Sequence, residues 1–218
     1  LIPALFIDMF GDPATNPKGW DIGNIEDLGP LDRGKSKHRP RDAEGLYGGP
    51  YPFIQTGDVA NSGGIIEKYN AAYSEMGLKQ SRLWPKNTLC ITIAANIAMT
   101  GILEFDSCFP DSVVGFLPNQ SFDAEYIQGL FHFLQPILEQ QAPQAAQKNI
   151  NLKILRDIKI PIPDEKLRKN FTENISSIRA VVKQKNQSLE KQRSLFQSLL
   201  HHAFAGTLTA GAMQEQAA

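Results

Sequence analysis

Cysteine is scarce in this 218-residue sequence, in which Cys90 and Cys108 are the only two. One pair so far apart supplies neither the disulfide framework of a small secreted domain nor the ligands of a structural zinc site. We therefore expect two buried thiols in a reducing compartment and no metal site. The sequence also lacks a basic stretch ahead of its first apolar residues, so no signal peptide is predicted. It lacks an initiator Met, which indicates a processed, trimmed or partial chain.

Long apolar runs are also missing. The longest nearly uncharged stretch, residues 88–103, is too short and too polar to cross a bilayer, because it contains Thr92, Asn96, Thr100 and Gly101. The 42% hydrophobic content is nevertheless enough to bury a core. The length fits one large domain or one and a half.

Catalytic motifs are missing too. No Gly-x-Gly-x-x-Gly follows a predicted strand, and neither Gly-x-Ser-x-Gly nor His-Glu-x-x-His occurs. Residues 29–36 match the phosphate-loop pattern Gly-x-x-x-x-Gly-Lys-Ser, but no good strand precedes them and Pro40 opposes the helix that must follow. Cys90 lies in a predicted strand and Asp58 at a predicted turn, so both are expected to be structural. The sequence predicts no catalytic residue.

Charge is balanced overall, with 22 Lys and Arg against 23 Asp and Glu, but it is unevenly distributed. Residues 32–41 contain five basic side chains and one acid, and residues 164–204 contain eight basic side chains and four acids. Each segment thus has a surplus of four positive charges, although the formal net charge of the chain is −1. The first surplus is compatible with a polyanionic partner, whereas the second is typical of the solvated face of a helix.

Residues 1–160 are rich in Gly and Pro and contain short apolar runs. The best predicted strand, 88–94, is β-branched and follows the turn signal Trp84-Pro-Lys-Asn87. Apolar residues at every third or fourth position predict a helix over 123–140 with a kink at Pro136. The predicted fold class is α+β, a compact mixed α/β domain followed by one long C-terminal coiled-coil helix. Further strands are expected at 51–56, 101–105, 112–117 and 158–163.

The long helix is predicted from a heptad pattern that begins after Pro163 and ends before Gly206, with no Pro or Gly in between. A helix of about 40 residues is about 60 Å long, which exceeds the width of a domain of this size. Its seam therefore predicts a partner helix, with Lys185 and Gln192 as polar positions that fix the register. The alternative is a helix packed on its own domain. The predicted dimer or partner contacts are Phe171, Ile175, Ile178, Val182, Leu189, Phe196 and Leu199.

The two ends of the chain are similar to each other. Residues 5–11 and 199–206 both place apolar residues ahead of a Phe and a Gly, as in the last turn of an amphipathic helix that ends at a Gly cap. The first residues of the chain therefore resemble the last turn of a long helix, and a complete helix of this kind is predicted at the C-terminal end. This pattern is typical of one unit of a tandem array, although two matches this short also arise by chance.

The basic segment 33–41 is a loop by composition, and Pro40 restricts its backbone. Lys and Arg neutralise phosphates, Arg also binds guanine edges, and hydroxyl, imidazole and amide groups add hydrogen bonds to bases. Similar polar or flat side chains follow at predicted strand ends and after the Gln- and Ala-rich stretch 140–147. The predicted DNA contacts are Arg33, Lys35, Ser36, Lys37, His38, Arg39, Arg41, Tyr47, Gln55, Thr56, Asn96, Lys148 and Asn149.

In combination, these motifs resemble one half of the DNA specificity subunit of type I restriction–modification systems, a target recognition domain followed by its spacer helix. The resemblance covers nearly the whole chain and depends on the order and spacing of its motifs. One departure concerns the first turn of the helix, where Asp164-Glu165 stands in place of the family's usual Glu-Gln pair. The matching motifs are Leu5-Phe-x-x-Met-Phe-Gly-Asp-Pro13, Asn16-Pro-Lys-Gly-Trp20, Arg33-Gly-Lys-Ser36 running on to Arg41, Tyr51-Pro-Phe-Ile-Gln-Thr-Gly-Asp-Val59, Trp84-Pro-Lys86 running on to Thr92, Gln147-Lys-Asn-Ile-Asn151, Ile160-Pro-Ile-Pro163 and Leu199-Leu-x-x-Ala-Phe-x-Gly206.

The resemblance implies a division of labour. This chain would select the DNA sequence as a non-catalytic, half-size specificity subunit in the cytoplasm of a bacterium or archaeon. Methylation and restriction subunits would bind S-adenosylmethionine, ATP and Mg²⁺, and this chain would bind none of them. Two copies paired through the helix would read a symmetric, interrupted sequence. The implied organisation is a lead-in segment at 1–19 that resembles the end of a preceding spacer helix, a recognition domain at 20–160, a spacer and dimerisation helix at 161–206 and a flexible tail at 207–218.

Two alternatives stay open on the sequence alone. The chain could be a fragment of a fused restriction–methylation enzyme, which methyl transfer or nucleotide hydrolysis by the chain alone would support. It could instead be a coiled-coil interaction protein without a DNA role. The latter predicts that DNA affinity is unchanged when Lys35, Lys37, Arg39 and Arg41 are replaced by Ala.

Overall fold

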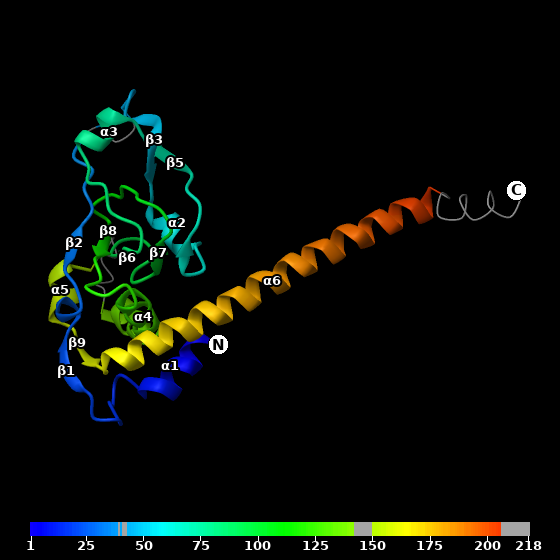
Figure 1. Cartoon of the computed structure of the whole chain (residues 1–218). Coiled ribbons are helices and arrows are strands. Elements are labelled where there is room, and N and C mark those ends of the chain that lie inside the picture. The colour runs from blue at the N-terminus through cyan, green and yellow to red at the C-terminus, as the bar shows by residue number, and fades with distance from the viewer. Residues whose placement is uncertain (39, 41–42, 142–149, 206–218) are drawn as a thin grey trace, which may run out of the picture. The chain divides into compact units, whose positions relative to one another are not determined.

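The computed structural model describes residues 1–38, 40, 43–141 and 150–205, and Figure 1 labels most of its helices and strands. The chain divides into two units, residues 1–172 and 173–218. The first, called the recognition unit below, combines strands with helices. The second consists, within its described residues, of the greater part of one long helix. The predicted α+β class with a long C-terminal helix is confirmed.

Strands and helices are interspersed along the first unit. The strands form three sheets in the orders β1-β9, β2-β8-β6-β7-β4 and β3-β5. The helices are α1 (Ile2–Phe10), the 3-10 helix η1 (Ile25–Asp27), α2 (Thr56–Ala60), α3 (Glu75–Lys79), α4 (Asp123–Gln141), α5 (Leu152–Asp157) and α6 (Glu165–Phe204). The strands are β1 (Asp21–Asn24), β2 (Leu31–Arg33), β3 (Tyr47–Phe53), β4 (Ile65–Ile66), β5 (Ala71–Tyr73), β6 (Leu89–Thr92), β7 (Thr100–Leu103), β8 (Val113–Phe116) and β9 (Lys159–Ile162).

The five-stranded sheet contains the most deeply buried strands. Every residue of β6 and of β8 is buried, which suits their β-branched and apolar side chains. Strands β2, β8, β6 and β7 pair antiparallel, and β4 runs parallel to β7. In this register Arg33 lies opposite Val114, and Thr92 lies opposite Val113. Strands β2 and β6 therefore both finish at the same end of the sheet, called the β2/β6 end below.

A cluster of aromatic rings joins α1 and α4 to the first turns of α6. The ring of Phe6 lies 5.6 Å from that of Tyr126 and 5.8 Å from that of Phe171, measured between centroids. All three residues are buried. Because each ring removes a large apolar area from water, the N-terminal helix is an integral part of the recognition unit.

A buried ion pair joins the start of α4 to the start of α6. Arg168 Nε lies 2.8 Å from Asp123 Oδ1, and the two side chains are 9% and 1% exposed. The Arg168 guanidinium also donates to the carbonyl oxygen of Pro163. Burial raises the pKa of Asp123 above the usual range, while the neighbouring Arg168 opposes that rise.

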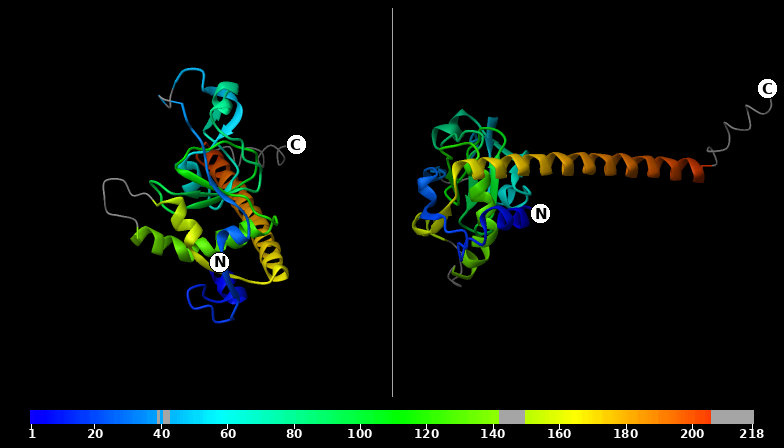
Figure 2. Two further views of the ribbon diagram at one scale, coloured as in Figure 1. Left: turned by 90° about the vertical axis from the view of Figure 1, so that its left-hand side faces the viewer. Right: turned by 60° about the horizontal axis from the view of Figure 1, so that its bottom comes forward.

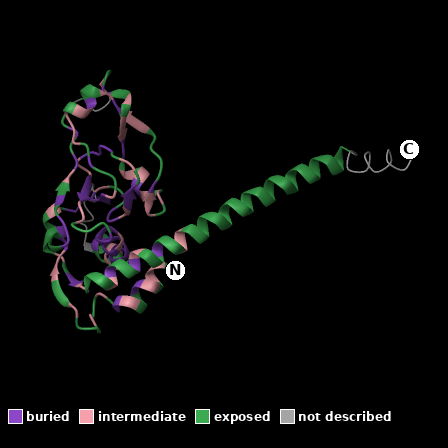
Figure 3. Cartoon of the chain, viewed as in Figure 1, coloured by how far each residue is buried: buried purple, intermediate pink, exposed green. Residues whose placement is uncertain are grey.

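Helix α6 is unbroken from Glu165 to Phe204, and Figure 2 shows it from two further sides. From residue 180 to residue 205 it is exposed throughout (Figure 3). Phe171 and Ile175, predicted as partner contacts, are instead buried, and Phe171 packs against Phe10 within the recognition unit. The other predicted seam residues are half-buried or exposed: Ile178, Val182, Leu189, Phe196 and Leu199.

The structure bears on four further interpretations of the sequence. The predicted tail at 207–218 lies outside the described residues. No helix in the described part of the chain is both long and apolar enough to cross a membrane. The sequence argued against a phosphate loop at residues 29–36, and the structure agrees, because β2 occupies the middle of that string and residues 36–38 form no helix. Cys90 and Cys108 are buried as predicted, and burial raises the pKa of both thiols.

Candidate nucleic-acid interface

The described part of the basic segment, residues 33–38, leaves β2 as an extended chain. Exposure alternates along it, since Gly34 and Ser36 are buried whereas Lys35 and Lys37 are exposed. This alternation has the two-residue period of a strand, so both lysine side chains lie on one outer face. Arg39 and Arg41, also predicted as DNA contacts, lie outside the described residues.

The start of the segment packs tightly on the chain that precedes β8. A Cβ on Gly34 would lie 2.3 Å from the carbonyl oxygen of Phe109, so only glycine fits at this position. The next backbone N–H, that of Lys35, donates to the same carbonyl at 3.0 Å. The carbonyl of Lys35 in turn accepts a hydrogen bond of 2.7 Å from Ser81 Oγ. The backbone that carries Lys35 is therefore fixed on both sides.

The rest of the segment is held by the β3-β5 sheet and the residue that follows α3. Ser36 Oγ lies 3.3 Å from the hydroxyl of Tyr73, whose ring stacks on that of Phe53 at 4.1 Å. The backbone N–H of His38 donates to Gln80 Oε1 at 2.9 Å. Ser36 is only 7% exposed, so its side chain anchors the segment from inside.

The two lysines carry positive charge that is not neutralised locally. Within the residues that the structure describes, neither ammonium group has a carboxylate in ion-pair range. Arg82 differs from them, because its guanidinium binds Asp32 at 2.8 Å and lies 3.8 Å above the ring of Trp84. Two unpaired cations on one face are suited to the phosphates of a polyanion.

The hairpin that joins β6 to β7 carries Asn96 at its tip. The backbone N–H of Ala98 donates to the carbonyl oxygen of Thr92 at 2.8 Å, which closes the hairpin. Asn96 is exposed, whereas Ile97 and Ala98 are each only 2% exposed. Since the hairpin continues β6, Asn96 projects from the β2/β6 end, where the basic segment also leaves the sheet.

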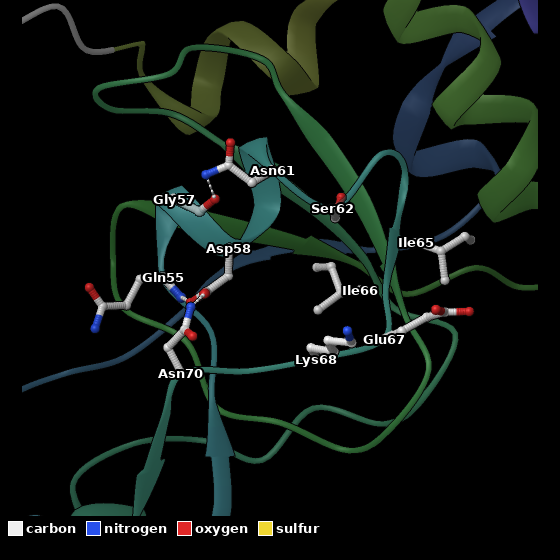
Figure 4. Close-up of a pocket in the computed structure, with 10 residues that line it drawn as sticks. All are labelled: Gln55, Gly57, Asp58, Asn61, Ser62, Ile65, Ile66, Glu67, Lys68 and Asn70. Carbon is white, nitrogen blue, oxygen red and sulfur yellow. Dashed lines mark hydrogen bonds between the residues drawn. The ribbon is translucent and has the colours of Figure 1, made fainter. Parts of the chain in front are cut away.

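The predicted contacts Gln55 and Thr56 lie at the start of α2. The Asp58 carboxylate accepts hydrogen bonds from Asn70 Nδ2 at 2.6 Å and from the backbone N–H of Gln55 at 2.8 Å. Figure 4 shows the Gln55 carboxamide directed away from Asp58. Asp58 is thus structural, as the sequence indicated. Gln55 borders a cavity of about 550 Å³ whose lining residues are Gln55, Gly57, Asp58, Asn61, Ser62, Ile65, Ile66, Glu67, Lys68 and Asn70.

Tyr47, another predicted contact, belongs to β3 and is 36% exposed. Its ring lies 5.2 Å from that of Tyr73, so one side of the ring contacts the unit and the other reaches solvent. On the same strand, Tyr51 donates its hydroxyl to Glu75 Oε1 at 2.5 Å, and this carboxylate raises the pKa of Tyr51.

The structure therefore gathers part of the predicted set. The backbone N–H of Ile150 donates to the carbonyl oxygen of Ile93 at 2.9 Å, so Ile150 lies at the β2/β6 end. The predicted contacts Lys148 and Asn149 lie outside the described part of the chain. The described members that lie at the end of β2 or beyond β2 and β6 at this end are Arg33, Lys35, Ser36, Lys37, His38 and Asn96, of which Ser36 is directed inward.

The side chains that hold the basic segment were not predicted. Gln80 lies 42 residues beyond its partner His38, and Ser81 lies 46 residues beyond its partner Lys35. Neither residue stands in a recognisable motif, so no local signal could have identified it.

The chain as a whole is similar to known proteins. Residues 17–193 match the family model described as "Type I restriction modification DNA specificity domain". The type I restriction enzyme MjaIX specificity subunit of Methanocaldococcus jannaschii is 24% identical over 183 residues, which cover 80% of this chain and 42% of that protein.

Two solved structures share the fold. The HsdS subunit from Thermoanaerobacter tengcongensis matches with a TM-score of 0.63 and 18% identity, over 95% of this chain and 50% of that one. A type I restriction-modification system S subunit from M. genitalium matches with a TM-score of 0.60 and 15% identity, over 88% of this chain and 47% of that one. The chain thus spans about half the length of these relatives. Because the family model covers most of the recognition unit and continues into α6, the chain belongs to the type I restriction modification DNA specificity domain family.

Proposed function

We propose that this chain supplies one DNA-reading half of a type I restriction–modification specificity subunit. In this proposal the recognition unit binds double-stranded DNA, and α6 pairs with the same helix of a second copy. Methylation and restriction subunits perform the chemistry and bind S-adenosylmethionine, ATP and Mg²⁺. The chain itself contributes sequence choice and no catalysis. Family membership supports this role, and the charge and position of the basic segment support the place of DNA contact.

The observation that carries the proposal is the outward-facing pair Lys35 and Lys37. Their common backbone is fixed from inside by Phe109, Tyr73 and Ser81, so little conformational entropy is lost when DNA binds. Neutralising phosphates with two unpaired ammonium groups releases counterions, which drives association. The other predicted contacts are also proposed to touch DNA, with the exception of Ser36, whose buried side chain is directed toward Tyr73.

Replacing both lysines by Ala tests the site. Each phosphate contact contributes about 0.9 to the slope of log Kobs against log salt concentration. The variant Lys35→Ala/Lys37→Ala should therefore bind every duplex more weakly, with a slope smaller by about two. Fluorescence anisotropy of a labelled duplex between about 50 and 200 mM salt measures both quantities.

A matched control removes the same charge elsewhere. Lys159 of β9 and Lys166 in the first turn of α6 are also exposed, and Lys159→Ala/Lys166→Ala should keep the wild-type slope. If the Lys35/Lys37 variant kept wild-type affinity and slope, the interaction-protein alternative without a DNA role would be favoured.

Methylation mapping tests the wider role. Together with its methylation subunits, the chain should direct adenine methylation to one interrupted DNA sequence. A target with two-fold symmetry would indicate two copies of this chain. Methyl transfer by the purified chain alone would contradict the non-catalytic role and favour the fused-enzyme alternative.

A further inference from the structure

We propose that the β6–β7 hairpin is the base-reading element of the recognition unit, with Asn96 contacting a base edge while Lys35 and Lys37 contact phosphates. This inference depends on the proposed DNA-binding function and goes beyond it, because it assigns different roles to residues that the sequence could only group together. It starts from the geometry of the hairpin between Thr92 and Met99.

The hairpin holds Asn96 in one place. The Thr92 hydroxyl donates to the carbonyl oxygen of Asn96, and the backbone N–H of Met99 donates to Thr92 Oγ1 at 3.1 Å. Directly after the tip, Ile97 and Ala98 are each 2% exposed, so the returning strand is anchored in the core. A side chain on such a tip binds a ligand with little loss of conformational entropy.

The backbone of the tip is also strained. Ala95 and Ala98 adopt φ values of 63° and 58°, a left-handed conformation that alanine rarely adopts. Strained residues of this kind persist where the surrounding structure holds them, and they are concentrated at binding and catalytic sites. Here the strain flanks one exposed polar side chain, that of Asn96.

The chemistry of the tip fits a base better than a phosphate. Ala94 and Ala95, which precede Asn96, are small and uncharged, so the amide can approach a groove floor without steric hindrance. Among the described residues the Asn96 side chain has no hydrogen-bond partner. A carboxamide offers a donor and an acceptor together, which match N7 and N6–H of adenine in the major groove. It carries no charge with which to neutralise a phosphate.

The hairpin lies at the same end of the sheet as the two lysines. Asn96 projects from the β2/β6 end, where the segment with Lys35 and Lys37 also leaves the sheet. Phosphate contacts fix a protein on the duplex, and base contacts then specify the sequence. One end of one sheet thus presents both kinds of group.

The test compares base preference with salt dependence. The full chain, its Asn96→Ala variant and its Lys35→Ala/Lys37→Ala variant are each equilibrated with a library of duplexes randomised over the target, and the bound fraction is sequenced. Asn96→Ala should lose discrimination at one position by about 5- to 150-fold, the equivalent of about 1–3 kcal/mol, and should keep the wild-type salt slope. The lysine variant should keep its base preferences and lose slope.

Two further variants distinguish the loss of a base contact by Asn96 from a change in the shape of the hairpin. Asn96→Asp keeps the size of the side chain but can only accept hydrogen bonds, so preference at that position should change from adenine toward cytosine. Gln120→Ala is the control, because it also removes an exposed side-chain amide. Gln120 follows β8 at the other end of the sheet from Asn96, so this variant should leave every base preference unchanged.

The outcomes are distinguishable. If the wild-type chain shows no base preference at any position, both the proposed function and this inference fail. If the wild-type chain has preferences that Asn96→Ala and Asn96→Asp leave intact, the proposed function stands and this inference is overturned. It is equally overturned if Asn96→Ala weakens all duplexes alike and lowers the salt slope, because that result would identify the tip as a phosphate contact.

Discussion

The two units of this chain differ in how far their apolar side chains are buried. In the recognition unit, residues such as Leu89, Val113 and Phe171 are fully buried. In the described part of the second unit, Leu189 is 44% exposed and Phe196 is 63% exposed. Burial of one such side chain stabilises a fold or an interface by about 1.5–3 kcal/mol. Apolar burial therefore stabilises the recognition unit through contacts within the unit itself. The helix gains this free energy only when another surface covers its seam.

The largest expected effect comes from placing charge on that seam. Leu189→Glu/Phe196→Glu should abolish self-association. A two-fold dimer contains both substitutions in each copy, so four apolar side chains are lost from the interface and the free energy of association falls by more than about 6 kcal/mol. Sedimentation velocity across micromolar concentrations measures the association. Unfolding of the recognition unit should be unaffected, since both positions lie in the second unit.

The control for this prediction places the same charges elsewhere on the helix. Gln187 and Ser194 are exposed and lie outside the seam, so Gln187→Glu/Ser194→Glu should pair as the wild type does. A wild-type chain that stays monomeric at high micromolar concentration would contradict the self-pairing proposal. It would leave a non-identical helix as the partner of the seam.

The second effect is confined to the recognition unit. Arg168→Met leaves the Asp123 carboxylate buried without its ion-pair partner, which should cost about 3–5 kcal/mol in the free energy of unfolding. Urea denaturation followed by tryptophan fluorescence measures the loss. In Arg168→Met/Asp123→Leu no unpaired charge is left, so most of the stability should return.

The pH dependence of this defect has a defined sign. Burial raises the folded-state pKa of Asp123, and removal of Arg168 raises it further. A carboxyl group with a raised folded-state pKa favours the folded state at low pH and loses that contribution as pH rises through the raised pKa. The difference between Arg168→Met and wild type should therefore shrink as pH falls through the raised pKa toward the unfolded-state value. A constant difference would mean that Arg168 acts mainly through packing.

The same contrast explains how far the sequence could predict the structure. The long helix and strand β6 were predictable because their patterns are local: heptad spacing up to Phe204, and a β-branched run after Trp84. The burial of Phe171 was not, because the heptad continues through it and nothing in that repeat indicates that α1 packs there. The sequence predicts the end of a strand and a turn where α2 lies, because Gln55 is not one of the usual N-cap residues, and the Asp58 carboxylate that accepts from the backbone N–H of Gln55 at 2.8 Å is equally typical of a turn.

The candidate site shows the same limit. Composition identified the basic segment, but it could not separate Lys35 and Lys37 from Ser36, because the inward direction of Ser36 depends on Tyr73, 37 residues away. Asn96 was selected as a polar residue at a strand end. What distinguishes it is the register of β2, β8 and β6, which brings the hairpin to the end where the basic segment leaves the sheet. Such long-range pairing is not contained in any local pattern.

The smallest expected effect concerns backbone strain, which also separates the two units. The described residues with φ above zero, including Ala95 and Ala98, all lie in the recognition unit. Because a left-handed alanine costs about 1–2 kcal/mol and glycine loses about 0.5–1 kcal/mol more entropy on folding, Ala95→Gly should stabilise the unit by up to about 1 kcal/mol. Ala94, its neighbour, is not in the positive-φ set, so Ala94→Gly should instead destabilise it by about 0.5–1 kcal/mol. Thermal unfolding of the two variants measures the difference, and equal shifts would show that the hairpin relaxes its strain in solution.

If the tip reads a base, Ala95→Gly should also weaken the preference for that base despite the added stability, since a more flexible tip orders Asn96 only on binding.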